Sequence, residues 1–490
     1  MLKDHRLMTI QAADTGDCRY PRHLGIFHHG RADMDSPAYV LATLMKAEED
    51  GAHPAELAAL RRRLQQLDEP RAGLLAGEAL EPLTDVAELV ELPEPSTEQA
   101  REVLDRLVVV KLNGGLGTSM GLTGPKSLLE VKDGMSFLDV IATQVLAERE
   151  RYGVRLPLLL MNSAATRGPS LAALDRYEGL RGQQVPRDFL QGREPKLRAG
   201  DRFPVEWPAD PELEWCPPGH GDLYTALAAS GTLNTLLDAG LRWCFVSNSD
   251  NLGATVDVRL AAWIAAERIP FAMEAVRGTP ADRKGGHLAL HQGQVVLRET
   301  AQVPEGDASF TDVGRWQFYN TNNLWIDLRA LRELQEADPA APALPLIVNR
   351  KTVDPKDPSS TPVIQLETAM GAAIGSIPGA RPVLVPRTRF APVKTTDDLL
   401  VVRSDAYELT GDGRMIPTFD GPGPVVALDP ERFRLMPDFE KRFPAGPPSL
   451  RRSTGLRVKG DVTFGANIVV EGDVQLTGPL LVPDGEGLRG

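Results

Sequence analysis

The sequence predicts an α/β protein, in which a β-sheet flanked by helices lies between a helical N-terminal region and a C-terminal parallel β-helix. Two observations predict this fold. Between residues 101 and 420, short apolar runs such as VVVKL, LPLLLM and RPVLVP alternate with longer segments of helical periodicity. Between residues 421 and 490, apolar residues recur every six positions, which is typical of stacked coils.

Residues 1–100 are expected to be helical. The segment PAELAALRRRLQQL places Ala, Leu, Glu and Arg at a spacing close to 3.6, and the pattern ends near the prolines of ELPEPSTEQA. The opening residues, MLKDHRLMTIQAAD, contain no continuous apolar stretch, which argues against a secretory signal. This region shows no residues whose chemistry indicates a role.

Composition limits the class of protein. The chain has 490 residues, which is enough for two or three domains, and no run of 18 apolar residues that would indicate a membrane span. A net charge of −13 opposes non-specific binding to nucleic acid, so a phosphate ligand must be held by a few local cations. The three cysteines, Cys18, Cys216 and Cys244, indicate neither a disulfide framework nor a zinc cluster, which predicts a cytoplasmic protein.

Residues 108–127, VVVKLNGGLGTSMGLTGPKS, carry the first candidate site. Three β-branched residues predict a buried strand, and the five glycines that follow it leave room for a ligand to approach the main chain. The P-loop pattern fails because Pro125 separates Gly124 from Lys126, and the dinucleotide pattern fails because Met120 stands where its third glycine belongs. The stretch is therefore another kind of phosphate loop or a tight turn without a ligand.

Two motifs follow along the chain. In WCPPGHGDLY, at 215–224, Gly219 and Gly221 flank His220 and would let a ligand lie against the backbone, while Asp222 suits the N-cap of the next helix. A structural histidine is the alternative. In FVSNSDNLGAT, at 245–255, Asp250 follows a predicted strand, where a hard cation bridging phosphates would be held. An Asx turn is equally consistent with that motif.

Three later motifs add polar groups. DRKGGHLAL contains Lys284 before a glycine pair, FYNTNNLWIDL contains three asparagines, and RFAPVKTTDDLLV contains Lys394 where an apolar stretch meets a polar one. Asparagine amides commonly read sugar hydroxyls, but each of these residues can also be an ordinary loop or turn residue.

The C-terminal region repeats itself, since KGDVTF at 459–464 is followed by EGDVQL at 471–476. Apolar residues fall in two rows of period six, and glycines stand at the corners, which predicts a parallel β-helix; a β-hairpin remains the alternative. So few coils must pack on the main domain or on another subunit. The final coil would leave an apolar row ending at Leu476 and Leu480, which predicts a homo-oligomer formed through this region.

These motifs together resemble one known family. LNGGLGTSMGLTGPKS, WCPPGHGDLY, FVSNSDNLGATVD, NTNNLWI, VIQLETAMGAAI and RFAPVKTTDDLLVV resemble, in this order, the eukaryotic-type UTP:glucose-1-phosphate uridylyltransferases, also called UDP-glucose pyrophosphorylases. The resemblance covers about residues 100–480. It implies a GT-A-like, Rossmann-like nucleotidyltransferase domain with a mixed sheet at 101–420 and a left-handed β-helix at 421–490. It further implies that UTP and glucose 1-phosphate are converted to UDP-glucose and pyrophosphate.

The resemblance also implies roles for single residues. Lys126 and Lys394 would neutralise phosphate charge, and Asp250 would hold Mg²⁺ between phosphate oxygens. DFLQGREPK resembles the segment that reads uracil through a glutamine, which would be Gln191, although Gln183 and Gln184 remain open. The other implied nucleotide residues are Leu112, Asn113, Gly114, Gly115 and Gly219, and the implied sugar-phosphate residues are His220, Asn248, Ser249, Lys284, Gly286, Asn320, Thr321, Asn322 and Asn323.

Several other functions fit less well. A uridylyltransferase with a covalent histidine intermediate would need a His-x-His triplet, which the sequence lacks, and a nicotinamide oxidoreductase would need the missing third glycine. A non-catalytic nucleotide-binding scaffold is disfavoured because both lysines and Asp250 occur together. A pyrophosphorylase for another UDP-sugar, such as UDP-N-acetylglucosamine, stays open, since a hydroxyl and an acetamide differ by one wall of a pocket.

Overall fold

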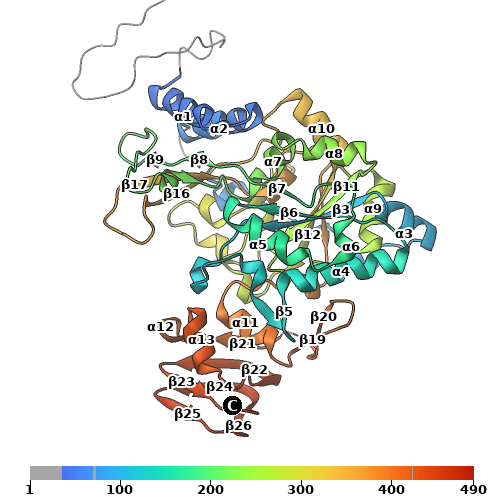
Figure 1. Cartoon of the computed structure of the whole chain (residues 1–490), viewed down its shortest axis with the longest axis vertical. Coiled ribbons are helices and arrows are strands. Elements are labelled where there is room, and N and C mark those ends of the chain that lie inside the picture. The colour runs from blue at the N-terminus through green and yellow to red at the C-terminus, as the bar shows by residue number, and fades with distance from the viewer. Residues whose placement is uncertain (1–35, 70–72, 422) are drawn as a thin grey trace, which may run out of the picture.

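The computed structural model describes residues 36–490 apart from 70–72 and 422, so the opening residues and Cys18 lie outside the described residues. Figure 1 shows a pair of N-terminal helices at one end, the central sheet with its helices in the middle, and the C-terminal coils at the other end. In the described part of the chain, no helix is both long and apolar enough to cross a membrane.

The central sheet is mixed, as expected. Strands β3, β6, β7 and β11 run parallel to one another, whereas β15 runs antiparallel to β11 and β12. A hairpin of β13 (His287–His291) and β14 (Gln294–Arg298) attaches to β15. The main path consists of β2 (Ala87–Glu88), β18 (Arg381–Leu384), β12 (Phe271–Arg277), β15 (Phe318–Asp327), β11 (Trp243–Asn248), β3 (Leu107–Asn113), β6 (Leu158–Asn162) and β7 (Asp188–Leu190).

The valine run of β3 explains how this strand is placed. Val109 packs into one apolar core, and Val108 and Val110 pack into a second core on the opposite face of the sheet. Side chains of a strand alternate between the two faces, so a continuous apolar run is buried only where both faces are covered. The predicted buried strand is therefore confirmed.

Helices cover both faces of the sheet (Figure 1). Two of them, α7 and α8, are separated at Gly231, which adopts a left-handed φ of 70°. The principal helices around the sheet are α3 (Thr97–Leu104), α4 (Phe137–Tyr152), α5 (Ala164–Leu174), α7 (Leu223–Ala229), α8 (Thr232–Asp238), α9 (Val258–Glu267), α10 (Leu328–Ala337) and α11 (Thr396–Arg403).

The N-terminal region is only partly helical. Helix α1 (Ala38–Glu49) packs on α2 (Pro54–Leu67), which matches the predicted segment and begins with a capping box at His53. The chain then enters the central sheet, since β1 (Glu81–Pro82) pairs with β13 and β2 pairs with β18. The expectation of a helical region up to residue 100 was wrong for residues 81–88, because two-residue strands leave no periodic signal.

The C-terminal strands pair in parallel, and pairs from three of their ladders share one interval. Leu456 pairs with Val474, Val462 with Leu480, and Val470 with Leu488, so each partner lies 18 residues further along the chain. Parallel pairing excludes the β-hairpin alternative. The strands are β21 (Val425–Ala427), β22 (Ser449–Lys459), β23 (Val462–Phe464), β24 (Val469–Thr477), β25 (Leu480–Val482) and β26 (Gly487–Arg489).

The outer edge of these coils agrees only in part with the expectation of an open row ending at Leu476 and Leu480. Strand β26 pairs only with Val469 to Glu471 at the start of β24, and Leu476 is partly buried. Leu480 is 40% exposed, as expected, its neighbour Leu481 on β25 is 70% exposed, and Val425 on β21 is 56% exposed.

Candidate active site

Loops that are far apart in sequence meet at the carboxyl ends of β3 and β11. The two strands are parallel neighbours, and Asn248 at the end of β11 lies opposite Leu112. Beyond the strand, the Ser249 amide donates to the Leu112 carbonyl at 3.3 Å. Open α/β sheets bind their ligands in crevices at this edge.

A third segment, residues 389–394, joins these two loops. The Val393 amide donates to the Asp250 carbonyl at 3.0 Å, and Pro392 forms an antiparallel bridge with Asn251. This backbone pairing brings Lys394 to the loop that follows β11.

The three residues predicted to act on phosphate form one charged cluster. Lys126 Nζ lies 2.8 Å from Asp250 Oδ2, and Lys394 Nζ lies 3.0 and 2.8 Å from Asp250 Oδ1 and Oδ2. Burial alone would raise the pKa of the Asp250 carboxyl, but the ammonium groups of Lys394 and Lys126 outweigh burial and hold the pKa below its usual value. Two cations on one anion leave a local positive charge that favours a phosphate ligand.

The two lysines are held differently. Lys126 also donates to the Val393 carbonyl, and its side chain is 15% exposed. Among the described residues, the Lys394 ammonium group bonds only to Asp250, and the Lys394 side chain is 55% exposed. Lys126 is therefore held by two partners, whereas Lys394 is held by one and is more exposed.

Two glycines of the loop after β3 allow the turns of the backbone, and a third leaves open space beside the loop. Gly117 and Gly121 adopt left-handed φ angles of 63° and 74°, which glycine tolerates best. The Lys126 amide donates to the Gly115 carbonyl at 3.1 Å and closes the loop. A Cβ at Gly115 would meet no heavy atom within 4 Å, so open space lies beside this residue.

The next candidates lie at the start of this loop. Asn113 is buried, and its amide donates to Asn162 Oδ1 at 2.7 Å and to Ser170 Oγ at 2.8 Å, so this side chain orders the strand end. A Cβ at Gly114 would lie 2.4 Å from Gln191 Oε1. Gly114 thus allows the Gln191 amide to lie directly on the loop.

The two other glutamines that were considered lie elsewhere. The Gln183 amide donates to the Leu158 and Pro186 carbonyls, each at 3.0 Å, so it holds the start of β6. Gln184 is exposed. Of the three glutamines, only Gln191 is in contact with the glycine loop.

The glycines around His220 make room for the protein itself. A Cβ at Gly219 would lie 2.6 Å from the Thr368 carbonyl oxygen, and one at Gly221 would lie 2.3 Å from Thr368 Oγ1. The Met370 amide donates to His220 Nδ1 at 3.0 Å, so the proton of the neutral ring lies on Nε2. His220 can therefore donate one hydrogen bond from Nε2.

We expect His220 to remain neutral from about pH 5 to 8. Burial, assisted by the positive charge of Lys394, lowers the pKa of His220 to about 4, below the value of 6.5 of the unfolded chain. The stability that the neutral ring contributes is therefore complete above pH 6.5 and is lost as the pH falls through about 4. An NMR titration of the histidine rings, assigned by comparison with His220→Gln, measures this pKa, and a midpoint near 6.5 would contradict the expectation.

Asp222 stands at the N-cap position of α7 but does not cap this helix. Its Oδ2 instead accepts a hydrogen bond from the Gly192 amide at 2.6 Å, although Gly192 is 30 residues away in sequence. The capping expectation was wrong, because this carboxylate is turned toward another loop.

The asparagine-rich strand divides its side chains between two environments. Asn320 and Asn322 are partly exposed, and the Asn320 amide donates to Asn322 Oδ1 at 2.8 Å. Thr321 and Asn323 are buried and bond to Glu274, through its carbonyl at 2.7 Å and its Oε2 at 3.0 Å. Only the first pair is accessible to a sugar, and the second pair supports the strand.

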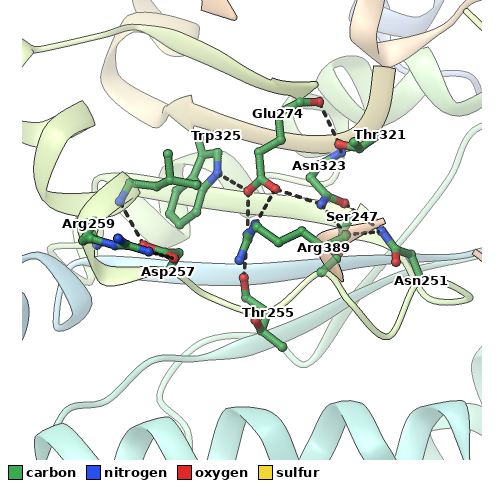
Figure 2. A network of polar contacts seen from close by, with 12 residues as sticks. Ser247, Asn251, Thr255, Asp257, Arg259, Glu274, Thr321, Asn323, Trp325 and Arg389 are labelled. Atoms are coloured by element: carbon green, nitrogen blue, oxygen red, sulfur yellow. Dashed lines mark hydrogen bonds and ion pairs between the residues drawn. The ribbon is translucent and has the colours of Figure 1, made fainter. Parts of the chain in front are cut away.

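A buried ion pair between Arg389 and Glu274 holds the first residue of the segment 389–394 (Figure 2). Arg389 Nε donates to Glu274 Oε2 at 2.8 Å, and Arg389 Nη2 donates to Glu274 Oε1 at 2.6 Å. Trp325 and Asn323 donate to the same carboxylate, and Asn251 donates to the Arg389 carbonyl at 3.1 Å. The loops of Asp250 and Lys394 are therefore tied to one buried carboxylate.

Two sugar-site candidates lie apart from the charged cluster. Lys284 is exposed, and its carbonyl accepts from Thr300 Oγ1 at 2.8 Å. Gly286 is buried, and a Cβ there would lie 2.6 Å from Glu299 Oε1. The Gly286 carbonyl accepts from the Asn320 amide at 2.9 Å, so Gly286 lies beside the accessible asparagines.

Three supporting residues were not predicted. Glu274, Arg389 and Lys111 are buried in or beside the sheet. Burial lowers the pKa of Lys111 to about 7, and its ammonium group donates to Ser247 Oγ at 2.6 Å and to the Ala254 carbonyl at 2.9 Å. The available signal was a charged residue inside an apolar run, as in VVVKL and FAMEAVR.

Similar proteins place these features in context. The family model described as UTP–glucose-1-phosphate uridylyltransferase matches residues 62–471. Curated proteins of that name from Hordeum vulgare and Solanum tuberosum are each 40% identical, over 81% and 86% of this chain and 83% and 87% of their own length.

Solved structures are similar over nearly the whole chain. A UDP-glucose pyrophosphorylase mutant from Leishmania major in complex with UDP-glucose is 40% identical with a TM-score of 0.87, covering 93% of this chain and 99% of its own. A protein of Trypanosoma brucei described as UDP-glucose phosphorylase is 41% identical with a TM-score of 0.83, covering 93% of this chain and 100% of its own. The glycine loop and the aspartate bonded to two lysines are consistent with these matches, and the matches show that the chain belongs to the UTP–glucose-1-phosphate uridylyltransferase family.

Proposed function

We propose that this chain forms UDP-glucose and pyrophosphate from UTP and glucose 1-phosphate. The observation that carries the proposal is the clamp of Lys126 and Lys394 on Asp250 beside an open glycine loop. It supports phosphoryl chemistry, because such a reaction needs positioning and charge neutralisation rather than a covalent intermediate. Membership of the family supports the choice of substrates.

The reaction is an in-line displacement. An oxygen of glucose 1-phosphate attacks the α-phosphorus of UTP, and the bond from that phosphorus to the bridging oxygen breaks, so pyrophosphate leaves with the electron pair. Lys126 neutralises the UTP phosphates in the ground state. Lys394, the more exposed lysine, neutralises the charge that develops as the bond breaks.

The other residues bind and orient the substrates. We assign uracil to Gln191 with Gly219, and the ribose and base to the backbone of residues 112–115. We assign the sugar phosphate to His220 through Nε2, and glucose to Asn248 and the accessible asparagines of β15. Ser249, Lys284 and Gly286 complete the proposed sugar-phosphate side. Thr321 and Asn323 are supporting residues in this proposal, because Glu274 uses their polar groups.

We propose that Mg²⁺ assists the reaction through Asp250. No group of three His, Cys, Asp or Glu side chains able to hold a metal occurs among the described residues, so an all-protein cage does not fit. One carboxylate does fit Mg²⁺, which is usually held by one or two carboxylates plus substrate phosphates and water. When bound, the ion would offset negative charge on phosphate oxygens. The lysines serve this site by keeping Asp250 ionised.

An assay of pyrophosphate release tests the proposed function. UTP, ATP, dTTP and CTP are each offered with glucose, galactose and N-acetylglucosamine 1-phosphates. We expect the highest kcat/KM for UTP with glucose 1-phosphate. Preference for N-acetylglucosamine 1-phosphate would assign the chain to another UDP-sugar, and no release with any pair would support a scaffold.

We further propose three domains: residues 1–100, a catalytic domain at 101–420, and a left-handed parallel β-helix at 421–490. The 18-residue interval between paired strands supports the β-helix, since three six-residue sides make one coil.

We also propose that the protein is cytoplasmic. The thiols of Cys216 and Cys244 are free and buried, and thiols stay reduced in the cytoplasm.

The exposed side chains of β25 predict self-association through the C-terminal coils. The rings of Phe464 and Phe443 stack with their centroids 4.8 Å apart, so removing residues 456–490 would expose apolar side chains of the core. A point variant is therefore a sharper test than a deletion. We expect an oligomer that Leu481→Asp shifts toward monomer in light scattering at micromolar concentration. Val90→Asp, at a side chain that is 62% exposed in the N-terminal region, is the matched control. A monomeric wild-type protein would refute the prediction.

A further inference from the structure

The N-terminal helices contact the segment that follows β7. Helix α2 presents Glu56 and Arg63, which are seven residues apart and therefore lie on one face of the helix. Both side chains reach the stretch of residues 191–194, which contains the glutamine on the glycine loop. The two helices lie at the end of the molecule near β8 and β9, and they contact this segment without supplying a strand to the sheet (Figure 1).

Gly192 is enclosed by two carboxylates. A Cβ at this position would lie 2.9 Å from Glu56 Oε1 and 3.3 Å from Asp222 Oδ2. Asp222 is 2% exposed, and burial raises its pKa to about 6, so it is ionised at neutral pH and accepts the Gly192 amide hydrogen as a charged group. Glu56 is itself fixed, because its Oε2 accepts from the His53 amide at 2.7 Å.

The next two residues are held by ion pairs with the helices. Glu194 is 2% exposed and lies 2.6 Å from Arg63, which is 6% exposed. Arg193 lies 2.6 and 2.8 Å from the two carboxylate oxygens of Asp50, at the end of α1. Gln191 itself is fixed through its backbone, which donates to the Asn162 carbonyl at 2.8 Å.

We propose that Asp222 and the helices α1 and α2 increase the specificity of the site for UTP over CTP. They hold the backbone of residues 191–194, so that the Gln191 amide meets the base at one distance from the glycine loop. This inference rests on the proposed function, in which Gln191 reads uracil. Asp222 and Arg63 are positioning residues, since they act through Gln191.

The physical basis is that a hydrogen-bonded site rejects the wrong base only if its polar groups cannot move to suit it. UTP and CTP differ at one edge of the base, where a carbonyl oxygen is replaced by an amino group. An amide whose backbone is free to shift accommodates either base. The Gln191 backbone is held and its amide lies against Gly114, so the site leaves an unpaired polar group with one of the two bases.

The first test removes Asp222. We expect Asp222→Ala to raise KM for UTP about tenfold, to change kcat much less, and to lower the UTP-to-CTP ratio of kcat/KM about tenfold, because one charge-assisted hydrogen bond is lost. Asp222→Asn, which still accepts the Gly192 hydrogen through Oδ1, should restore most of the ratio. A purely structural role would lower the active fraction equally for both nucleotides and leave their ratio unchanged.

The second test approaches the segment from the helix. The double variant Arg63→Met with Glu194→Gln removes both buried charges together, so neither is left unpaired. We expect the same loss of discrimination. Arg62→Met is the matched control, because Arg62 is the neighbouring residue of α2 and pairs with Asp338 at 2.5 Å, away from the segment. This variant should leave the ratio unchanged.

A mutant cycle with Gln191 decides the mechanism. If Asp222 acts through Gln191, then Gln191→Ala with Asp222→Ala should discriminate no worse than Gln191→Ala alone. Additive losses, or an unchanged ratio in both Asp222→Ala and the double variant of Arg63 and Glu194, would overturn the inference. Failure of the wild-type protein to use any nucleotide would instead overturn the proposed function.

Discussion

Replacement of Lys394 by alanine is expected to lower kcat on the order of a hundredfold or more, with a smaller change in KM for UTP. The side chain is 55% exposed and its ammonium group bonds to Asp250 alone among the described residues, so little holds it when a negative charge appears nearby. An interaction that strengthens only as pyrophosphate leaves acts on kcat rather than on ground-state binding. Steady-state kinetics with saturating glucose 1-phosphate measures both parameters.

Two further variants make this result specific. Lys394→Arg keeps the charge but changes its geometry, and it should recover part of the rate. Lys356→Ala removes an exposed loop lysine to which no role in the site is assigned, and it should leave kcat unchanged. An increase confined to KM for UTP in Lys394→Ala would show that Lys394 binds ground state and transition state equally.

The glycine loop and the lysine cluster could be predicted because each follows an element with a strong local signal. Val108 to Val110 indicate a buried strand, and the glycines after it indicate a close approach to the main chain. Asp250 follows a second apolar strand. The carboxyl ends of neighbouring parallel strands meet at one edge, so the proximity of these two loops followed from the fold class.

The supporting network could not be predicted, because its members are distant in sequence and carry no pattern. Glu274 and Arg389 are 115 residues apart and meet only when β12 and the lysine segment pack together. Asp222 resembled a helix cap in sequence, yet its partner is Gly192. Such contacts depend on tertiary packing, which overrides a local preference.

The sequence also could not indicate which asparagines of β15 are accessible. Four successive polar residues appeared equally suited to a sugar. Asn322 adopts a left-handed φ of 58°, and the pairing of β15 with β12 is irregular opposite Glu274. The strand then turns Thr321 and Asn323 inward to the buried carboxylate. A bulge of this kind re-aims side chains without a clear sequence signal.

Asp250→Asn is expected to have the largest effect, a loss of kcat on the order of a thousandfold or more. The substitution removes the only carboxylate of the charged cluster, and with it the proposed protein ligand of Mg²⁺, whose neutralisation of phosphate charge contributes several kcal/mol. It also leaves Lys126 and Lys394 without their common anion, so UTP should still bind. In this variant kcat should therefore fall while the affinity for UTP is retained. Calorimetry with UTP measures that affinity.

The matched control for Asp250→Asn lies at the opposite end of the same sheet. Asp327 is 4% exposed and pairs with Arg242 at 2.8 Å, so Asp327→Asn also removes a buried, ion-paired carboxylate, but far from the glycine loop. If loss of such a carboxylate merely destabilised the fold, both variants would lose activity in proportion to their thermal stability. We expect Asp327→Asn to retain its kcat below its melting temperature. EDTA should abolish turnover of the wild-type protein, and full activity of Asp250→Asn in EDTA would exclude both the metal and its proposed ligand.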